Sequence, residues 1–339
     1  MNRYHRQTLL PGIGEAGQRR LAGSTALLVG CGALGTVIAE SLARAGVGRL
    51  VIVDRDVVEL TNLQRQTLFD ESDARDELPK AIAAKNRLAL INSEIRIDSV
   101  VADFTPRNGE RLAESVDVIV DGTDNLQTRY LLNDLAVKLG RPYVYGGAVG
   151  TTGLSYVVIP GAGPCLRCVF DDNTSGGGAT CDTAGVLGPL AGVIANIEAD
   201  ETIKLLTGNR PAVNRNMISI DLWSNTWRQI DVAAAYDTAC VCCGQRCFAH
   251  LEGRGADAAI LCGRNAVQIP ASSALNMQTI ADRLSPYGSV KRTEHLLRAD
   301  LTERGRSFQI TLFPDGRAIV HGTDDPALAR TLYARYIGA

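Results

Sequence analysis

The sequence predicts an α/β protein in which a mainly parallel sheet carries helices on both faces, followed by a small C-terminal α+β module. Three observations support this fold class. A glycine-rich turn near residue 30 joins an apolar run to a helical pattern. Strand and helix patterns then alternate, which is typical of strands that pair in parallel. Near residues 249–257 the periodicity stops, and a shorter unit with its own strands and helices follows.

The first strand and turn predict a nucleotide site. The apolar run at 26–29 indicates a buried strand, and it ends in the pattern Gly30-x-Gly32-x-x-Gly35 before a helix. Glycines let the backbone approach a phosphate, and the helix N-terminus offers N–H groups and partial positive charge. Asp54 ends the next apolar run, near the spacing at which a carboxylate meets a ribose hydroxyl. A dinucleotide such as NAD is the first ligand that this pattern suggests, and a turn without a ligand is the alternative.

The remaining elements of the first unit follow from periodicity and from turn residues. A short helix is expected at 15–22, before the glycine turn. Further helices are expected at 79–91, 108–114, 125–139 and 187–206, and strands at 95–101, 116–121, 143–146, 154–159, 217–222 and 226–231. Pro79 suits the first position of its helix, and Gly208 follows the end of the last one. Residues 173–179 are small and polar and predict a flexible loop.

The C-terminal unit is expected to be a small α+β module. It contains a predicted strand at 259–269, a helix at 277–285 and a final helix at 325–337. A hairpin should pair 307–313 with 317–321 across a Pro-Asp-Gly turn. We therefore divide the chain into a nucleotide-binding domain at 1–248, a linker at 249–257 and a domain at 258–339 whose role the sequence leaves open.

Composition argues against several classes of partner. The net charge is −2 and the isoelectric point is near 6.1, so no basic surplus favours nucleic acid or an anionic membrane surface. No apolar run approaches transmembrane length. We expect a cytoplasmic protein. In that compartment, nine cysteines favour metal binding or thiol chemistry over disulfides.

Cations after the second strand favour a triphosphate over a dinucleotide. The polar residues 59–66 are expected at the carboxyl edge of the sheet, beside the nucleotide. Arg65 offers a planar fork for phosphate oxygens, and Asn62 and Gln66 add neutral donors. An exposed surface arginine is an equally good interpretation of Arg65 on spacing alone. Lys80 lies in the first turn of its helix, where a cation is mildly unfavourable unless an anion is present.

Asp124 is the candidate magnesium ligand. The segment Asp121-Gly-Thr-Asp124-Asn125 ends another strand at the same edge of the sheet. Magnesium is usually held by one or two carboxylates together with phosphate oxygens. The alternative is that Asp124 caps the helix that follows. Both roles are compatible.

Two C-x-x-C pairs predict a structural zinc site. Cys165 and Cys168 form one pair, and Cys240 and Cys243 form the other. Together they supply the four thiolates of a closed tetrahedral Zn²⁺ site, which would tie two distant loops together. Cys242 and Cys247 crowd the second pair, so a shifted choice of ligand stays open.

Cys181 follows the flexible loop directly. A thiol on a mobile segment is a candidate nucleophile, because it can swing toward a bound substrate. A half-buried packing cysteine is the alternative. Cys31 and Cys262 are interpreted as packing residues, and none of the four histidines has a partner at ligand or triad spacing.

Taken together, these motifs resemble the ThiF/MoeB/HesA family, the bacterial relatives of ubiquitin-activating enzymes. The resemblance covers roughly residues 1–247. It extends over nearly the whole chain for the ThiF branch found in bacilli. The motifs that carry it are Arg3-Tyr4-x-Arg6-Gln7, the turn at 30–35, Asp54-x-Asp56, Asn62-Leu-Gln-Arg65-Gln66, Pro79-Lys80, Asp121-x-Thr-Asp124-Asn125, both C-x-x-C pairs, Gly178-Ala-Thr-Cys181-Asp-Thr-Ala-Gly185, Leu261-Cys-Gly-Arg-Asn and Asp315-Gly-Arg-x-x-Val-His-Gly-Thr.

The resemblance implies a Rossmann-like fold and an ATP-dependent reaction. A small β-grasp sulfur carrier would be adenylated by MgATP on the carboxylate of its Gly-Gly end, with release of pyrophosphate, for thiazole formation in thiamin biosynthesis. The implied catalytic residues are Arg6, Arg65, Lys80, Asp124 and Cys181. The implied ATP-binding residues are Gly30, Gly32, Ala33, Gly35, Asp54, Asp56, Asn62, Gln64, Arg65, Gln66, Lys80, Asp124 and Asn125.

By resemblance, Arg6 would reach the ATP site of a neighbouring subunit, which implies a homodimer. Cys181 would take part in sulfur transfer or form a covalent adduct with the activated carrier. The module after residue 250 has only Cys262, so sulfur is expected from a separate protein, of the cysteine desulfurase or rhodanese type. The alternatives are activation of the molybdopterin synthase carrier, an NAD-dependent oxidoreductase, and a scaffold in which the nucleotide is structural.

Overall fold

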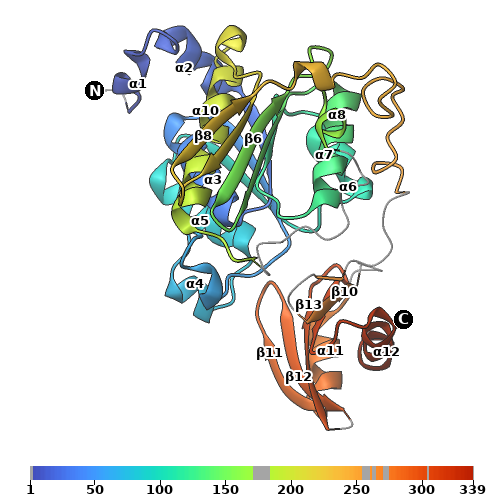
Figure 1. Ribbon diagram of the computed structural model, residues 1–339. Helices are drawn as coiled ribbons and strands as arrows, with labels where there is room; N and C mark the ends of the chain where they lie inside the picture. Colours follow the sequence, from blue (N-terminus) through green and yellow to red (C-terminus); the bar gives the residue numbers. More distant parts are fainter. Residues whose placement is uncertain are drawn as a thin grey trace. The chain divides into compact units, whose positions relative to one another are not determined.

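The computed structural model describes residues 3–170, 184–253, 260–261, 265–269, 275–303 and 305–338. The chain divides into two compact units, Met1–Gly255 and Ala256–Ala339 (Figure 1). Each unit has its own sheet and its own hydrophobic core. Residues 254–257 of the predicted linker lie outside the described part of the chain, and the roles assigned to the domains stay predictions.

The first unit is built on an eight-stranded sheet with the order β3-β2-β1-β4-β5-β6-β7-β8. Strands β3, β2, β1, β4 and β5 run parallel, which confirms the predicted mainly parallel sheet. The last three strands extend it in antiparallel fashion, because short turns join β5 to β6 and β7 to β8. The strands are β1 (Thr25–Val29), β2 (Arg49–Asp54), β3 (Arg96–Val101), β4 (Val118–Asp121), β5 (Tyr143–Val149), β6 (Thr152–Val158), β7 (Met217–Asp221) and β8 (Thr226–Ile230).

Helices cover both faces of the parallel part of this sheet (Figure 1). On one face lie α3 (Ala33–Ala45), α5 (Lys80–Ile91) and α10 (Gly188–Leu206), and on the other lie α6 (Pro106–Ala113), α7 (Leu126–Leu139) and α8 (Leu166–Val169). Leu28 belongs to the first core and Leu27 to the second. A strand buried on both faces needs apolar residues at every position, which explains the continuous apolar runs of the sequence.

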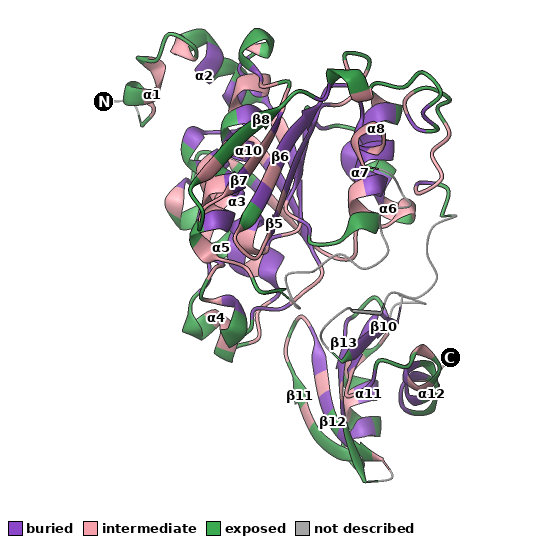
Figure 2. Cartoon of the chain, in the orientation of Figure 1, coloured by how far each residue is buried: buried purple, intermediate pink, exposed green. Residues whose placement is uncertain are grey.

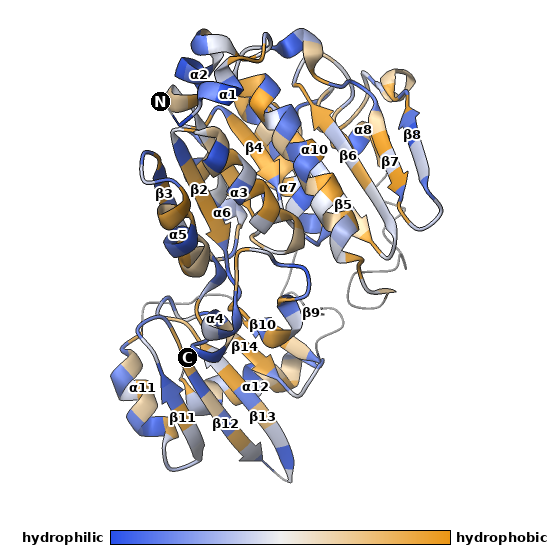
Figure 3. Cartoon of the chain, turned by 90° about the vertical axis from the view of Figure 1, so that its left-hand side faces the viewer, coloured by the Kyte–Doolittle hydropathy of each residue, from blue (hydrophilic) through white to orange (hydrophobic). Residues whose placement is uncertain are grey.

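Burial falls from the centre of this sheet to its edge. All four residues of β4 are buried. β8 is exposed along most of its length (Figure 2). Hydropathy changes in the same direction, since β4 is largely hydrophobic and β8 is not (Figure 3). The shorter elements of the unit are α1 (His5–Thr8), α2 (Gly14–Gly23), η1 (Leu60–Asn62), α4 (Glu71–Arg75), η3 (Arg210–Ala212) and η4 (Ala233–Ala235).

The second unit is a six-stranded antiparallel sheet with the order β11-β12-β13-β14-β10-β9. Two helices, α11 (Met277–Leu284) and α12 (Pro326–Tyr336), contribute to its core. The strands are β9 (Ile260–Leu261), β10 (Ala266–Ile269), β11 (Gly288–Arg292), β12 (Leu297–Glu303), β13 (Arg306–Leu312) and β14 (Ala318–His321). The predicted hairpin is formed by β13 and β14, and the predicted helices are present.

Two details of the second unit differ from the prediction. The single strand expected at 259–269 is two short strands, because β9 and β10 pair with each other in antiparallel fashion. The strands β11 and β12 were not predicted. β12 alternates buried Leu297, Ala299 and Leu301 with polar residues, whereas β11 offers one apolar side chain, Val290, and gives almost no periodic signal. None of the helices in the described part of the chain has the length and apolar character needed to cross a membrane.

Candidate active site

The glycine turn lies against the loop that follows β4. Gly30 has φ +88°, a backbone conformation that side chains disfavour, and a Cβ atom there would lie 2.5 Å from the Gly122 carbonyl oxygen. A Cβ atom at Gly35 would overlap the Gly30 carbonyl. Gly32 is different, because a Cβ atom there would meet only Gln66 Nε2, at 3.8 Å. The space beside Gly32 is therefore the open side of the turn.

The N-terminus of α3 faces this turn. The helix begins at Ala33, and its N-cap residue is Gly32, which has no side chain to accept from the first N–H groups. Helix N–H groups without a side-chain cap are suited to phosphate oxygens, and the helix dipole favours the same charge. The predicted phosphate-binding geometry of Gly30, Gly32, Ala33 and Gly35 is thus compatible with the observed backbone.

Asp54 joins the glycine turn to the end of β2. Its Oδ2 accepts the Cys31 N–H at 2.6 Å, and its Oδ1 accepts the Asp56 N–H at 2.7 Å. Burial raises the pKa of Asp54, and the charge of Lys80 opposes that shift. The carboxylate therefore organises the turn. Its predicted contact with a ribose would use the remaining lone pairs and stays a prediction.

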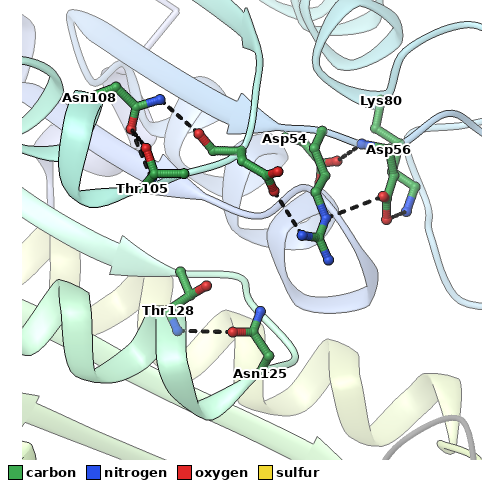
Figure 4. Close-up of polar contacts among 9 residues, drawn as sticks. Asp54, Asp56, Lys80, Thr105, Asn108, Asn125 and Thr128 are labelled. Atoms are coloured by element: carbon green, nitrogen blue, oxygen red, sulfur yellow. Dashed lines mark hydrogen bonds and ion pairs between the residues drawn. The ribbon is translucent and has the colours of Figure 1, made fainter. Parts of the chain in front are cut away.

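A chain of ion pairs runs beside Asp54 (Figure 4). Lys80 Nζ lies 3.2 Å from Asp56 Oδ2, Arg55 Nε lies 3.7 Å from Asp56 Oδ1, and Arg55 Nη1 lies 2.8 Å from Asp103 Oδ1. The lysine side chain is only 4% exposed. Asp56 thus supplies the anion that a lysine at a helix N-terminus requires. A lysine already balanced in this way can still contribute positive potential to the site, but its position alone does not demand a bound phosphate.

The residues predicted around Arg65 lie on and just after η1. Arg65 is half-buried and its Nη1 donates to the Thr61 carbonyl at 3.0 Å, so it is not the freely exposed arginine of the alternative interpretation. Asn62 is buried, and its Oδ1 accepts the Glu59 N–H at 3.1 Å. Gln66 is also buried, and its Oε1 has no hydrogen-bond partner among the described residues. Gln64 is exposed.

Asn125, not Asp124, caps the helix after β4. Asn125 Oδ1 accepts the Thr128 N–H at 2.9 Å (Figure 4). The alternative interpretation of Asp124 as the cap is therefore wrong, and the Asp124 side chain is exposed at the carboxyl edge of the sheet. Burial alone would lower the pKa of Arg55, but Asp56, Asp103 and, to a smaller extent, Asp124 raise it. Asp124 is thus close enough to this arginine to interact with its charge.

Sequence reasoning missed a buried network around Asp121. Tyr143 donates its hydroxyl to Asp121 Oδ2 at 2.6 Å, and Thr123 donates both its N–H and its hydroxyl to Asp121 Oδ1. Arg129 Nε lies 3.5 Å from Asp121 Oδ2, and Arg129 Nη2 donates to the carbonyls of Thr123 and Gly146. Only the spacing of Arg129 from Asn125, one helical turn apart, could have suggested that it faces the site.

Glu198 of α10 was also missed. It is fully buried, and neither carboxylate oxygen has a hydrogen-bond partner among the described residues. Burial raises its pKa well above the ordinary value, and the charge of Asp121 adds to the shift. The carboxyl group occupies the space left by Gly146, where a Cβ atom would overlap it. Burial without a hydrogen-bond partner thus favours the neutral acid form of Glu198.

The four predicted zinc ligands come together. The Sγ atoms of Cys165, Cys168, Cys240 and Cys243 all lie within 4.8 Å of one another. Three of the separations are 3.9, 3.8 and 3.4 Å. A tetrahedron with Zn–S bonds of about 2.3 Å has edges of about 3.8 Å, so these positions fit a structural Zn²⁺.

The neighbouring cysteines lie outside this cluster. Cys242 accepts a hydrogen bond from Asn133 Nδ2 at 3.2 Å and points into the core. Neither Cys242 nor Cys247 belongs to the group of four whose sulfur atoms meet. The unshifted set of ligands is the one that the geometry favours.

The N-terminal segment is anchored to the first unit and leaves Arg6 exposed on α1. Tyr4 accepts a hydrogen bond at its hydroxyl from Asn92 at 2.9 Å, and Gln7 donates to the side chain of Gln18 and to the Ala45 carbonyl. The predicted contact of Arg6 with a neighbouring subunit stays a prediction. Cys181, the loop at 173–179 and Cys262 lie outside the described residues.

Comparison with known proteins finds relatives that match most of the chain. The sequence profile of the ThiF family matches residues 4–242. The sulfur carrier protein ThiS adenylyltransferase of Bacillus subtilis (strain 168) is 42% identical over 342 residues, which cover 99% of both chains. The sulfur carrier protein adenylyltransferase of Thermus thermophilus is 35% identical over 72% of this chain and 91% of its own length.

Other relatives match a smaller share of the chain than the Bacillus subtilis protein does. Adenylyltransferase and sulfurtransferase MOCS3 of Sus scrofa is 39% identical over 72% of this chain, and the match spans about half (53%) of that protein. Among solved structures, Escherichia coli MccB crystallised with ATP is 24% identical with a TM-score of 0.62, over 72% of this chain and 75% of MccB. At that identity the likeness supports the α/β fold and nothing further.

Proposed function

The chain belongs to the ThiF family, and from this premise we propose that it is an ATP-dependent adenylyltransferase that activates a ThiS-like sulfur carrier protein. The observation that carries the proposal is the match to the Bacillus subtilis ThiS adenylyltransferase over 99% of both chains. That match includes the C-terminal module, whereas the match to MOCS3 covers 72% of this chain. The module therefore favours a carrier of thiamin biosynthesis over the molybdopterin synthase carrier.

The proposed reaction is an attack by the carrier's terminal Gly-Gly carboxylate on the α-phosphorus of ATP. A bond forms between a carboxylate oxygen and that phosphorus, the bond to the bridging oxygen of the β-phosphate breaks, and pyrophosphate leaves with the electron pair. The product is an acyl adenylate, which a sulfur nucleophile can attack. Bound Mg²⁺ would neutralise part of the charge on the phosphates.

Each part of the site suits one part of this reaction. The open side of the glycine turn and the N-terminus of α3 would hold phosphate oxygens. Arg65 and Lys80 would balance the charge that grows on the leaving pyrophosphate. Asp124, exposed at the edge of the sheet and not used as a helix cap, would hold Mg²⁺. Asp54 would bind the ribose.

Partners follow from the same proposal. The carrier is a small β-grasp protein that ends in Gly-Gly, and a separate sulfur donor would act after adenylation. Arg6, exposed on an anchored N-terminal segment, would complete the ATP site of a second subunit in a homodimer. Cys181 would react with the activated carrier or take part in sulfur transfer. The cysteine cluster would hold a structural Zn²⁺.

The test is exchange of labelled pyrophosphate into ATP. We expect exchange only when a purified ThiS-like carrier is present, and we expect Arg65→Ala and Asp124→Ala each to lower it by about a hundredfold, since each removes charge stabilisation of the transition state. Gln64→Ala, at an exposed neighbouring position, serves as the milder comparison. Wild-type exchange rates in both charge variants would contradict the site assignment. Thermal protection by NADH but not by MgATP would contradict the proposed nucleotide.

A further inference from the structure

Thr123, the residue that precedes Asp124, is held at its carbonyl and at its N–H by two charged side chains. The Thr123 carbonyl accepts a hydrogen bond from Arg129 Nη2 at 2.8 Å. The Thr123 N–H and hydroxyl donate to Asp121 Oδ1 at 2.8 and 2.6 Å. The polar groups of Thr123 are therefore fixed by Asp121 and Arg129. The direction in which Asp124 leaves the loop depends on these two side chains.

Arg129 is itself rigidly placed. Its Nη2 also donates to the Gly146 carbonyl of β5 at 3.2 Å, its Nε lies 3.5 Å from Asp121 Oδ2, and its guanidinium carbon lies 5.2 Å from the centre of the Tyr145 ring. The side chain is 13% exposed. A planar guanidinium can make these contacts together, whereas an ammonium group on a flexible stem cannot reproduce them.

The charge of Arg129 matters as well as its shape. Burial raises the pKa of Asp121, and Arg129 opposes that shift. Burial alone would lower the pKa of Arg129, but Tyr145, Asp121 and, to a smaller extent, Asp124 raise it. The guanidinium thus interacts with the charge of the buried Asp121 and, more weakly, with that of Asp124. Its removal would leave the buried Asp121 carboxylate without this counter-charge.

The same loop contacts the nucleotide turn. Gly122, one residue before Thr123, packs so closely on the Gly30 carbonyl that a Cβ atom at position 122 would overlap it. The glycine turn therefore fixes the Gly122 end of the loop, so loss of the Arg129 contacts should displace the Asp124 end. Small displacements of this kind are costly in a site that must align a metal, phosphates and an attacking group.

We propose that Arg129 is a positioning residue for Asp124. It acts through the Thr123 carbonyl and the Asp121 carboxylate, so that Asp124 is presented to Mg²⁺ in one orientation. This inference rests on the proposed function, because that proposal places Mg²⁺ at Asp124. Residues that orient a metal ligand commonly change metal affinity about 10- to 100-fold when they are replaced.

The experiment measures pyrophosphate exchange as a function of free Mg²⁺ at fixed ATP. Arg129→Met should raise the Mg²⁺ concentration for half-maximal exchange about 10- to 100-fold, and Arg129→Lys should raise it by less. Binding of ATP in the presence of EDTA should be unchanged in both. Arg141→Met is the matched control, because Arg141 follows the same helix and donates to Glu114, away from the loop. Its Mg²⁺ dependence should equal that of the wild type.

A lower melting temperature with an unchanged Mg²⁺ dependence would show that Arg129 is merely structural and would overturn the inference. If Arg129→Met does not fold, Arg129→Lys and Tyr143→Phe decide, and wild-type Mg²⁺ dependence in both overturns it. If the wild type shows no exchange with any carrier, the proposed function fails. The inference is then tested by calorimetry of ATP binding with and without Mg²⁺. Arg129→Met must weaken the binding measured with Mg²⁺ and leave the binding measured without it unchanged.

Discussion

Glu198 shows how much a single buried side chain can depend on its protonation state. The carboxyl group has no hydrogen-bond partner among the described residues. It lies against the Gly146 backbone, in the space that a Cβ atom there would need. An ionised carboxylate without a partner is costly in a protein interior, which is why its pKa is raised. The neighbouring Glu201 differs, because Lys204 and the Asn214 N–H satisfy its two oxygens.

The first prediction concerns pH and Glu198. Its folded-state pKa lies above the unfolded value, so its favourable contribution is complete below the unfolded pKa and is lost as pH rises through the folded one. Glu198→Gln keeps the shape and cannot ionise. The stability of the variant relative to the wild type should therefore rise from pH 5 to pH 8, by about 1.4 kcal/mol for each pH unit below the folded pKa.

Urea unfolding at both pH values measures this difference. Glu201→Gln, in the same helix, removes an acceptor that is already used and should lower stability instead. Parallel pH profiles for the wild type and Glu198→Gln would contradict the neutral-acid assignment.

Some of the site residues could be predicted from sequence because their meaning lies in neighbouring positions. The glycine turn, Asp54 and Asp124 each follow an apolar strand directly, and parallel strands bring their carboxyl ends to one edge. Arg129 and Glu198 could not be found in this way. Arg129 donates a hydrogen bond to the Gly146 carbonyl of β5, and the Glu198 carboxyl group fills the space beside the same glycine, about fifty residues earlier in the chain. Such contacts exist only after the sheet has formed.

At the scale of elements, α7 links the two functional regions of the first unit. Asn125 caps it at the edge that carries the glycine turn, and Arg129 holds the loop before it. Asn133 donates to Cys242 Sγ and accepts from the Leu166 N–H, beside the cysteine cluster. These positions are four residues apart, so they lie along one face of the helix. A single helix thus organises both sites.

The second prediction separates two roles of Asn125. Asn125→Ala should cost about 1 kcal/mol of unfolding free energy, because it removes the cap, whereas Asn125→Asp should keep the cap and the stability. If the side-chain amide also binds ATP, Asn125→Asp should be stable yet show a raised KM for ATP. An unchanged KM in Asn125→Asp would remove Asn125 from the predicted ATP-binding set.

Element prediction succeeded where periodicity was strong. The helices α5, α7 and α10 and the strands of the parallel sheet follow from apolar spacing and from turn residues. β11 escaped because Gly288–Arg292 contains a single apolar residue, and its strand state comes from pairing with β12. The break between β9 and β10 escaped because the run at 259–269 looks continuous in sequence, while β9 and β10 pair antiparallel as separate strands.

At the scale of the whole molecule, the cysteine cluster joins parts of the first unit that are distant in sequence. Cys165 and Cys240 are 75 residues apart, and their sulfur atoms lie 3.8 Å apart. A metal ion that binds only when both segments have come together adds its binding free energy to the stability of the folded chain.

The third prediction concerns that metal. Elemental analysis should find one zinc ion per chain, and Cys168→Ser should lower the unfolding free energy by about 3 kcal/mol or more. Cys247→Ser, at a half-buried thiol outside the cluster, should keep both zinc and stability. A folded, metal-free wild-type protein with unchanged stability would contradict the assignment.

The contact between Gly146 and Glu198 also constrains how the sequence can drift. A side chain at position 146 would overlap the end of the Glu198 side chain, so a larger residue there requires Glu198 to move or to be replaced by a smaller residue. In a combinatorial library that varies both positions, survivors should fall into matched pairs, with a larger residue at 146 only beside a smaller one at 198. The residue tolerated at one position would then depend on the residue at the other. Sequence variation at these two positions should therefore be correlated.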